Sequence, residues 1–212
     1  SDAWVKRYMS IVGLRLKNEL LGIRTLELET PQTKQSIACT RSFEELYTDF
    51  EPIRERIVTF AVQCAEKLRR QSSDCHALLI FVRTNFFRTD LPQYSRSIIV
   101  ELPFGTNSSF DVARYAVEGL RRIYRDGYAY KKAGVVVLDL TPSAQRQQTL
   151  FEQADPRHDL LFRAVDYLNR SLGQHKVKLA AQDLGRTWKM KQERVSPRYT
   201  TRLSDVIEVK AE

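Results

Sequence analysis

Basic and hydroxyl side chains stand next to each other in three segments of alternating apolar and polar residues, and two lysines open a fourth such segment. Guanidinium, ammonium and hydroxyl groups donate hydrogen bonds to phosphate oxygens, which positions nucleic acid without reading its sequence. Polar residues also alternate along any half-buried strand, so a merely solvated strand surface remains the alternative. The candidate nucleic-acid contacts are Arg41, Ser42, Arg83, Thr84, Arg96, Ser97, Lys131 and Lys132.

A second candidate is the segment QQTLF, in which Leu150 and Phe151 form an apolar pair inside a polar stretch. Exposed apolar groups need an explanation. They could pin the loop to its own domain. Alternatively, they could anchor a linear peptide in a hydrophobic pocket of a partner, with Gln147 making a polar contact at the rim.

Catalytic chemistry is not indicated. Catalysis by two metal ions requires clustered carboxylates, and the nearest acidic pairs, Glu27 with Glu29 and Glu44 with Glu45, are expected at the solvated surface. The three cysteines have neither CxxC spacing nor histidines placed to complete a zinc site. We therefore predict no catalytic residue, no metal site, no disulfide and no bound cofactor in this chain.

The charge balance favours a polyanionic partner, because 34 lysines and arginines outnumber 26 aspartates and glutamates and give a net charge of +8. No apolar run approaches the roughly 18 residues of a membrane helix, and no signal peptide is evident. We expect a cytoplasmic protein without membrane contact. Because the chain opens with Ser1 rather than methionine, we also expect a segment of a longer protein.

The pattern of elements predicts an α+β fold. Apolar residues at helical spacing, such as Ile53, Ile57 and Phe60, indicate a helix over 52–70, and a similar pattern indicates another over 110–126. Strands are expected over 36–43, 76–84, 95–102 and 133–140. This order is the split βαβ arrangement of the ferredoxin-like βαββαβ fold, with a four-stranded sheet, two helices on one face and the other face free for a partner.

Shorter elements are expected on either side. Helical spacing is visible over 5–21 and 159–172, and a short strand is indicated over 177–181. The predicted division is therefore a helical lead-in and linker over 1–33, the α+β domain over 34–140 and an extension over 141–212.

The strands do not resemble those of RNA-recognition motifs, which share this element order but stack bases on aromatic side chains of the central strands. SRSIIVEL has no aromatic residue, and SIACTRSF has only Phe43 at its end. We expect backbone tracking of a duplex rather than base stacking on this sheet.

Several segments together resemble the UmuC family of Y-family translesion DNA polymerases. They are VGLRLKNELLGI, CTRSF, AEKLR, YKKAGVVVLDL and SPRYTTRLSD, and they extend over almost the whole chain. The resemblance implies a remnant of the helical thumb domain over 1–33, a little finger domain over 34–140 and a UmuC-type C-terminal extension over 141–212.

The resemblance also implies a function. A little finger lays its sheet across the major groove and grips the backbone of primer–template DNA, while the metal-binding acids lie in the palm of the parent polymerase. This segment is then expected to be inactive alone, with magnesium required only by the parent enzyme in the bacterial SOS response. The implied partners are primer–template DNA, the sliding clamp, UmuD′ and RecA.

QQTLF resembles the clamp-binding pentapeptide of bacterial proteins through Gln147, Leu150 and Phe151. Gln148 stands where leucine is usual, and Thr149 conservatively replaces serine or aspartate. The resemblance therefore implies a tether to the sliding clamp. The alternative function is a protein-interaction domain whose basic surface binds a protein partner rather than DNA.

Overall fold

The chain divides into two units, Ser1–Lys34 and Gln35–Glu212. The computed structural model describes residues 1–27, 32–145, 155–173, 176–184, 195–207 and 209. In the first unit, helix α1 (Asp2–Leu20) agrees with the predicted helix, and Ser10 interrupts it with a backbone φ of 61°. None of its residues is buried, and Trp4 and Leu16 present apolar side chains to solvent.

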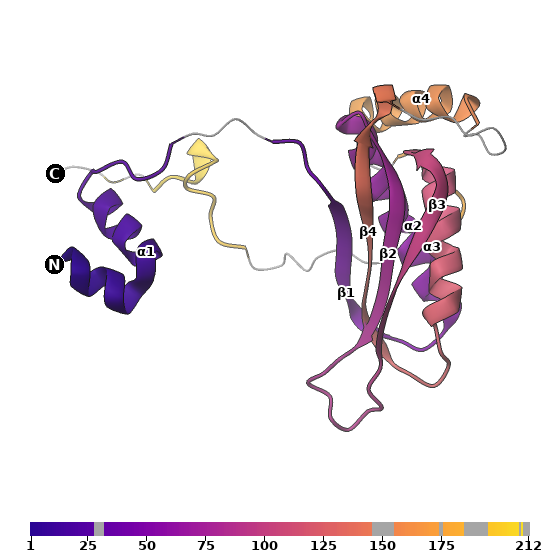
Figure 1. The fold of residues 1–212 in the computed structure, drawn as a ribbon, viewed down its shortest axis with the longest axis horizontal. Helices are drawn as coiled ribbons and strands as arrows, with labels where there is room; N and C mark the ends of the chain where they lie inside the picture. The colour runs from indigo at the N-terminus through magenta and orange to yellow at the C-terminus, as the bar shows by residue number, and fades with distance from the viewer. Residues whose placement is uncertain (28–31, 146–154, 174–175, 185–194, 208, 210–212) are drawn as a thin grey trace. The chain divides into compact units, whose positions relative to one another are not determined.

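The second unit contains the predicted α+β domain (Figure 1). Its antiparallel sheet has the strand order β1-β4-β2-β3, so that β4 lies between β1 and β2, and β2 lies between β4 and β3. Each half is thus a split βαβ unit, which confirms the predicted arrangement. The elements are β1 (Ile37–Tyr47), α2 (Phe50–Arg70), β2 (Ser73–Thr84), β3 (Ser95–Thr106), α3 (Ser109–Ile123) and β4 (Tyr130–Pro142).

Both helices pack against one face of the sheet, as predicted (Figure 1). The apolar stripe of α2, with Ile53, Ile57 and Phe60, is almost fully buried. The hydroxyl of Ser108 caps α3 by accepting a hydrogen bond from the backbone N–H of Asp111. Gly119 allows α3 to approach closely, because a Cβ at this position would lie 2.7 Å from Cδ1 of Ile80.

Successive residues of each strand point to opposite faces of the sheet. On β2, Leu78, Ile80 and Val82 are completely buried beneath the helices, whereas Leu79 and Phe81 are only half-buried. The core therefore lies between the sheet and the helix layer. We call the opposite side of the sheet the open face.

A C-terminal segment packs on the domain through α4 (Arg157–Ser171), which follows the short 3-10 helix η1 (Ser143–Gln145). Phe162 of α4 is buried, with its ring centroid 5.0 Å from that of Phe110. The guanidinium of Arg69 donates two hydrogen bonds of 2.7 Å to the carboxylate of Asp166. The last described helical turn is η2 (Leu203–Asp205).

The strand predicted over 177–181 is wrong. This stretch forms bends and a turn, held by the side chain of Asn169, which bonds to both the backbone N–H and carbonyl of Val177. The Gln182 side chain accepts a hydrogen bond from the N–H of Leu179. Side chains thus satisfy backbone groups that a strand would pair with a neighbouring strand.

The helices in the described part of the chain are all too short or too polar to span a membrane.

Candidate nucleic-acid interface

The strand register aligns four hydrophilic residues across the open face. Ser42 pairs with Lys132, Lys132 with Arg83, and Arg83 with Ser95. Residues directly opposite each other in antiparallel strands project from the same side of the sheet. These four residues therefore form a line across the whole sheet, which we call the basic row.

The basic row faces away from the helices. The neighbouring line of side chains contains Ala133 and Val82, both completely buried in the core, so alternation along β4 and β2 turns Lys132 and Arg83 to the open face. Neither cation makes a hydrogen bond or ion pair with another described residue. Two positive charges and two hydroxyls are thus available to phosphate oxygens.

The remaining predicted contacts fall in other places. Ser97 is exposed on the open face, in the next line of side chains, where it pairs with Phe81. Arg41 and Arg96 belong to the line of Ala133 and Val82, and therefore project from the helix side at opposite edges of the sheet. Strand pairing thus places Arg41 and Arg96 on the helix side and Ser97 on the open face, a difference that their positions in the sequence did not reveal.

Thr84 and Lys131 interact within the domain. Thr84 is buried, and its hydroxyl donates to Gln93 Oε1 at 2.8 Å while accepting from the N–H of Tyr94 at 3.1 Å. The ammonium of Lys131 donates to the carbonyl of Glu44 at 2.9 Å, where the register between β1 and β4 shifts. Both side chains therefore make contacts within the domain and do not belong to the basic row.

The centre of the open face is apolar, which the sequence interpretation missed. The register brings together Ala38, Val136, Leu79 and Ile99, and the Ile99 side chain is 57% exposed. The signal was present, because the second and fourth strands carry apolar residues on both faces. An apolar line of this kind can contact thymine methyl groups in a major groove or an apolar protein surface.

Phe81 places an aromatic ring on the open face at the central strand β2. The comparison with RNA-recognition motifs considered only the first and third strands and did not include this residue. The ring lies over Gly134, where a Cβ would be only 2.6 Å from Cε1 of Phe81 and 2.5 Å from Cγ2 of Thr40. Glycine is therefore required for this close packing. Phe81 remains half-buried between the basic row and the apolar centre.

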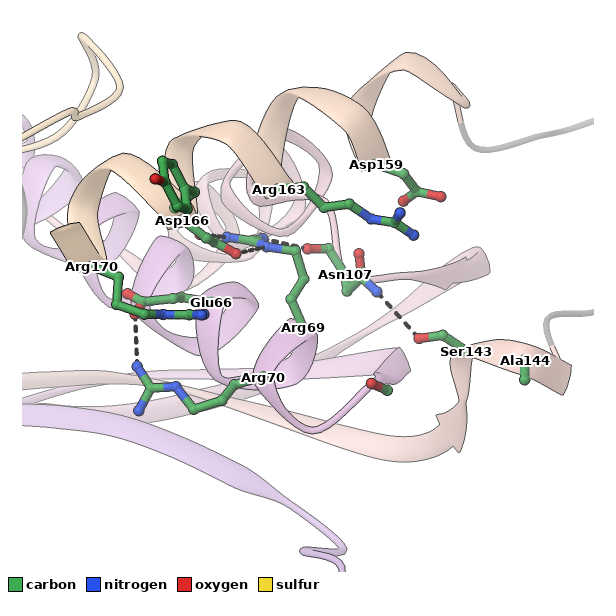
Figure 2. A pocket seen from close by; sticks show the side chains of 12 residues that line it. Glu66, Arg69, Arg70, Asn107, Ser143, Ala144, Asp159, Arg163, Asp166 and Arg170 are labelled. Carbon is green, nitrogen blue, oxygen red and sulfur yellow. Dashed lines mark hydrogen bonds and ion pairs between the residues drawn. The ribbon is translucent and has the colours of Figure 1, made fainter.

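A cavity of about 700 Å³ lies where α4 meets the end of α2, with Asn107 and η1 at its other side (Figure 2). Four arginines reach it, but carboxylates accompany them. Arg69 is paired with Asp166, and Arg70 donates to Glu66 at 2.8 Å. Because opposite charges are interleaved, the cavity serves to join α4 to the domain and does not form a strongly positive anion site. Its charged lining residues are Glu66, Arg69, Arg70, Asp159, Arg163, Asp166 and Arg170.

Two further predictions concern residues outside this surface. Gln147, Leu150 and Phe151 lie outside the described residues. Within the described part of the chain, no group of three or more histidines, cysteines or acidic residues could hold a metal ion.

Comparison with protein families gives two matches. Residues 34–150 match the impB/mucB/samB family C-terminal domain, and residues 159–209 match a domain of unknown function, DUF4113. The first match contains the sheet, both of its helices and the basic row. The second contains most of α4 and residues 176–184, of which Asp183 contacts Arg56 on α2.

Comparison with curated proteins finds relatives along almost the whole chain. Protein UmuC of Salmonella typhimurium is 38% identical over 99% of this chain and 50% of its own length. Protein ImpB of the same species is 37% identical over 97% of the chain and 49% of its own length. Protein MucB of Escherichia coli is 30% identical over 93% and 47%.

The chain spans about half the length of the curated relatives that it matches. The family domain covers more than half of the chain and coincides with the observed βαββαβ unit. The chain therefore belongs to the impB/mucB/samB family, and it contains the C-terminal domain of that family.

Proposed function

We propose that this chain is the DNA-holding and partner-docking part of an error-prone translesion DNA polymerase of the SOS response. Its open face grips the backbone of primer–template DNA as a little finger domain. The observation that carries the proposal is the basic row, in which Lys132 and Arg83 stand side by side with hydroxyls at both ends. Family membership and the resemblance to UmuC support it.

The parent enzyme would supply the chemistry. Its metal-binding acids and magnesium belong to a palm domain, and this chain alone is expected to bind primer–template DNA without extending it. Segment QQTLF, with Gln147, Leu150 and Phe151, would tether the enzyme to the sliding clamp. By the same resemblance, UmuD′ and RecA are proposed as partners of this bacterial cytoplasmic enzyme.

DNA binding is tested by changing the two cations of the basic row. The double variant Arg83→Ala with Lys132→Ala should bind primer–template DNA more weakly and with a flatter salt dependence. Each phosphate contact contributes about 0.9 to the slope of log K against log salt, so the slope should fall by about 1.8. Fluorescence anisotropy titrations at salt concentrations from about 50 to about 200 mM measure this slope.

The matched control is Arg114→Ala with Arg121→Ala, which removes two exposed arginines from α3 on the helix side of the domain. This variant has the same net charge as the test variant. An equal loss of slope in both variants would mean that only overall charge counts, and the assignment of DNA to the open face would be wrong.

Clamp binding is tested separately. Leu150→Ala with Phe151→Ala should abolish binding of the purified chain to the sliding clamp, because apolar anchors dominate such contacts. Binding to primer–template DNA should be unchanged. A clamp interaction that survives this double change in a pull-down would refute the proposed role of the peptide.

A protein-interaction domain is the second candidate, favoured by the apolar centre of the open face around Leu79 and Ile99. Monomeric proteins rarely expose large contiguous apolar patches without a partner. Under this proposal, the chain would show no salt-dependent affinity for primer–template DNA. The anisotropy experiment therefore decides between the two candidates.

A further inference from the structure

The loop between β2 and β3 presents an aromatic side chain almost entirely to solvent. Phe87 is 95% exposed, and its neighbour Phe86 is 53% exposed. The loop protrudes beyond the end of the sheet (Figure 1). An aromatic ring in such a position contributes nothing to the core, and its exposure carries a hydration cost that binding of a flat apolar group would relieve.

Side-chain hydrogen bonds hold this loop in one shape. The amide of Gln93 donates to the carbonyls of Asn85, Arg88 and Leu91 at 3.3, 2.7 and 3.0 Å. The N–H of Phe87 donates to Asn85 Oδ1 at 3.1 Å, which fixes the backbone that carries the ring. A preorganised loop loses little conformational entropy on binding.

An exposed ion pair adds to this arrangement. Arg88 donates to both carboxylate oxygens of Asp90, at 2.8 and 2.6 Å, and this hydrogen bonding lowers the pKa of Asp90 to about 2. The only nearby carboxylate of the loop is thereby neutralised by a guanidinium. It does not repel a polyanion that approaches Phe87.

The loop continues directly from the basic row. β2 ends one residue after Arg83 and β3 begins with Ser95, so both ends of the loop start at that row. The guanidinium of Arg83 also lies over the ring of Phe86, 5.1 Å from its centroid. A nucleic-acid backbone held by the basic row would therefore have the aromatic loop beside it.

We propose that Phe87 stacks on an unpaired base of nucleic acid whose backbone lies along the basic row. This inference rests on the proposed DNA-binding function and adds to it a preference for single-stranded character next to the duplex. Stacking on aromatic side chains is tolerant of base identity, since every base has a π-face. An unpaired base offers that face without the cost of unstacking a duplex.

The experiment compares a blunt duplex with the same duplex carrying a single-stranded template overhang. Phe87→Ala should weaken binding of the overhang substrate by about 5-fold or more, the lower end expected for loss of one stacked base. Binding of the blunt duplex should change by less than about 2-fold. Phe87→Trp should retain the overhang preference, because tryptophan also stacks.

The matched control is Tyr167→Ala, which removes another exposed aromatic side chain, on α4. It should leave both affinities unchanged.

A second readout is tryptophan fluorescence of the Phe87→Trp variant. Single-stranded oligothymidylate should quench this fluorescence more strongly than it quenches the fluorescence of the unsubstituted chain.

The outcomes separate this inference from the function on which it rests. If Phe87→Ala weakens both substrates equally, or neither, the stacking proposal is overturned. DNA binding by the basic row would still stand. If the unsubstituted chain binds neither substrate, both proposals fail.

Discussion

A buried ion pair fastens the stretch after α4 to the sheet domain. Nη1 of Arg56 lies 2.5 Å from Oδ2 of Asp183, and both side chains are only 6% exposed. Arg56 also donates to the hydroxyl of Tyr47 at 3.0 Å, and Thr59 Oγ1 accepts from the N–H of Asp183 at 3.3 Å. Removal of Asp183 would take away the buried carboxylate that faces the Arg56 guanidinium.

Asp183→Ala should therefore reduce the free energy of unfolding by about 3–5 kcal/mol, the range for breaking a buried pair. Urea denaturation followed by circular dichroism measures the change. The matched control is Asp90→Ala, which removes the partner of Arg88 from an ion pair at the surface and should leave the unfolding midpoint in place. Equal midpoint shifts in the two variants would contradict the buried role of Asp183.

The helices and strands of the domain could be predicted because their patterns are strong. The stripe of α2 has helical spacing throughout, and the strands are rich in β-branched residues between turn signals. Strand ends were underestimated: β3 extends to Thr106 rather than ending near residue 102, since pairing of Cys75 with Thr106 prolongs the ladder past an irregularity. Such long-range pairing is invisible in local sequence.

The site could be predicted only in part, for the same reason. Sequence placed Arg83 beside Thr84, but alternation sends the first to the open face and the second into the domain. Which member of each pair faces outward depends on register, which depends on contacts far apart in the chain. The exposed ring of Phe87 likewise follows from hydrogen bonds made by Gln93 across the loop.

Within the second unit, α4 and residues 176–184 pack on the helix layer. α4 contacts α2 through Arg69 and α3 through Phe110, and Asp183 reaches Arg56 on α2. These contacts lie on the side of the helices and not on the basic row. The described N-terminal part of the domain of unknown function, α4 and residues 176–184, is therefore attached to the helix layer, on the side of the sheet away from the basic row.

Methyl NMR of the chain with primer–template DNA tests the central claim most directly, because neighbouring residues of one strand report on opposite faces. Leu79, Ile99 and Val136 report on the open face, whereas Leu78 and Val135 report on the core. DNA should shift or broaden the methyl signals of the first three and leave the other two nearly unchanged. Changes confined to methyls on the helix side of the domain, such as those of Val117 on α3, would contradict DNA binding by the open face.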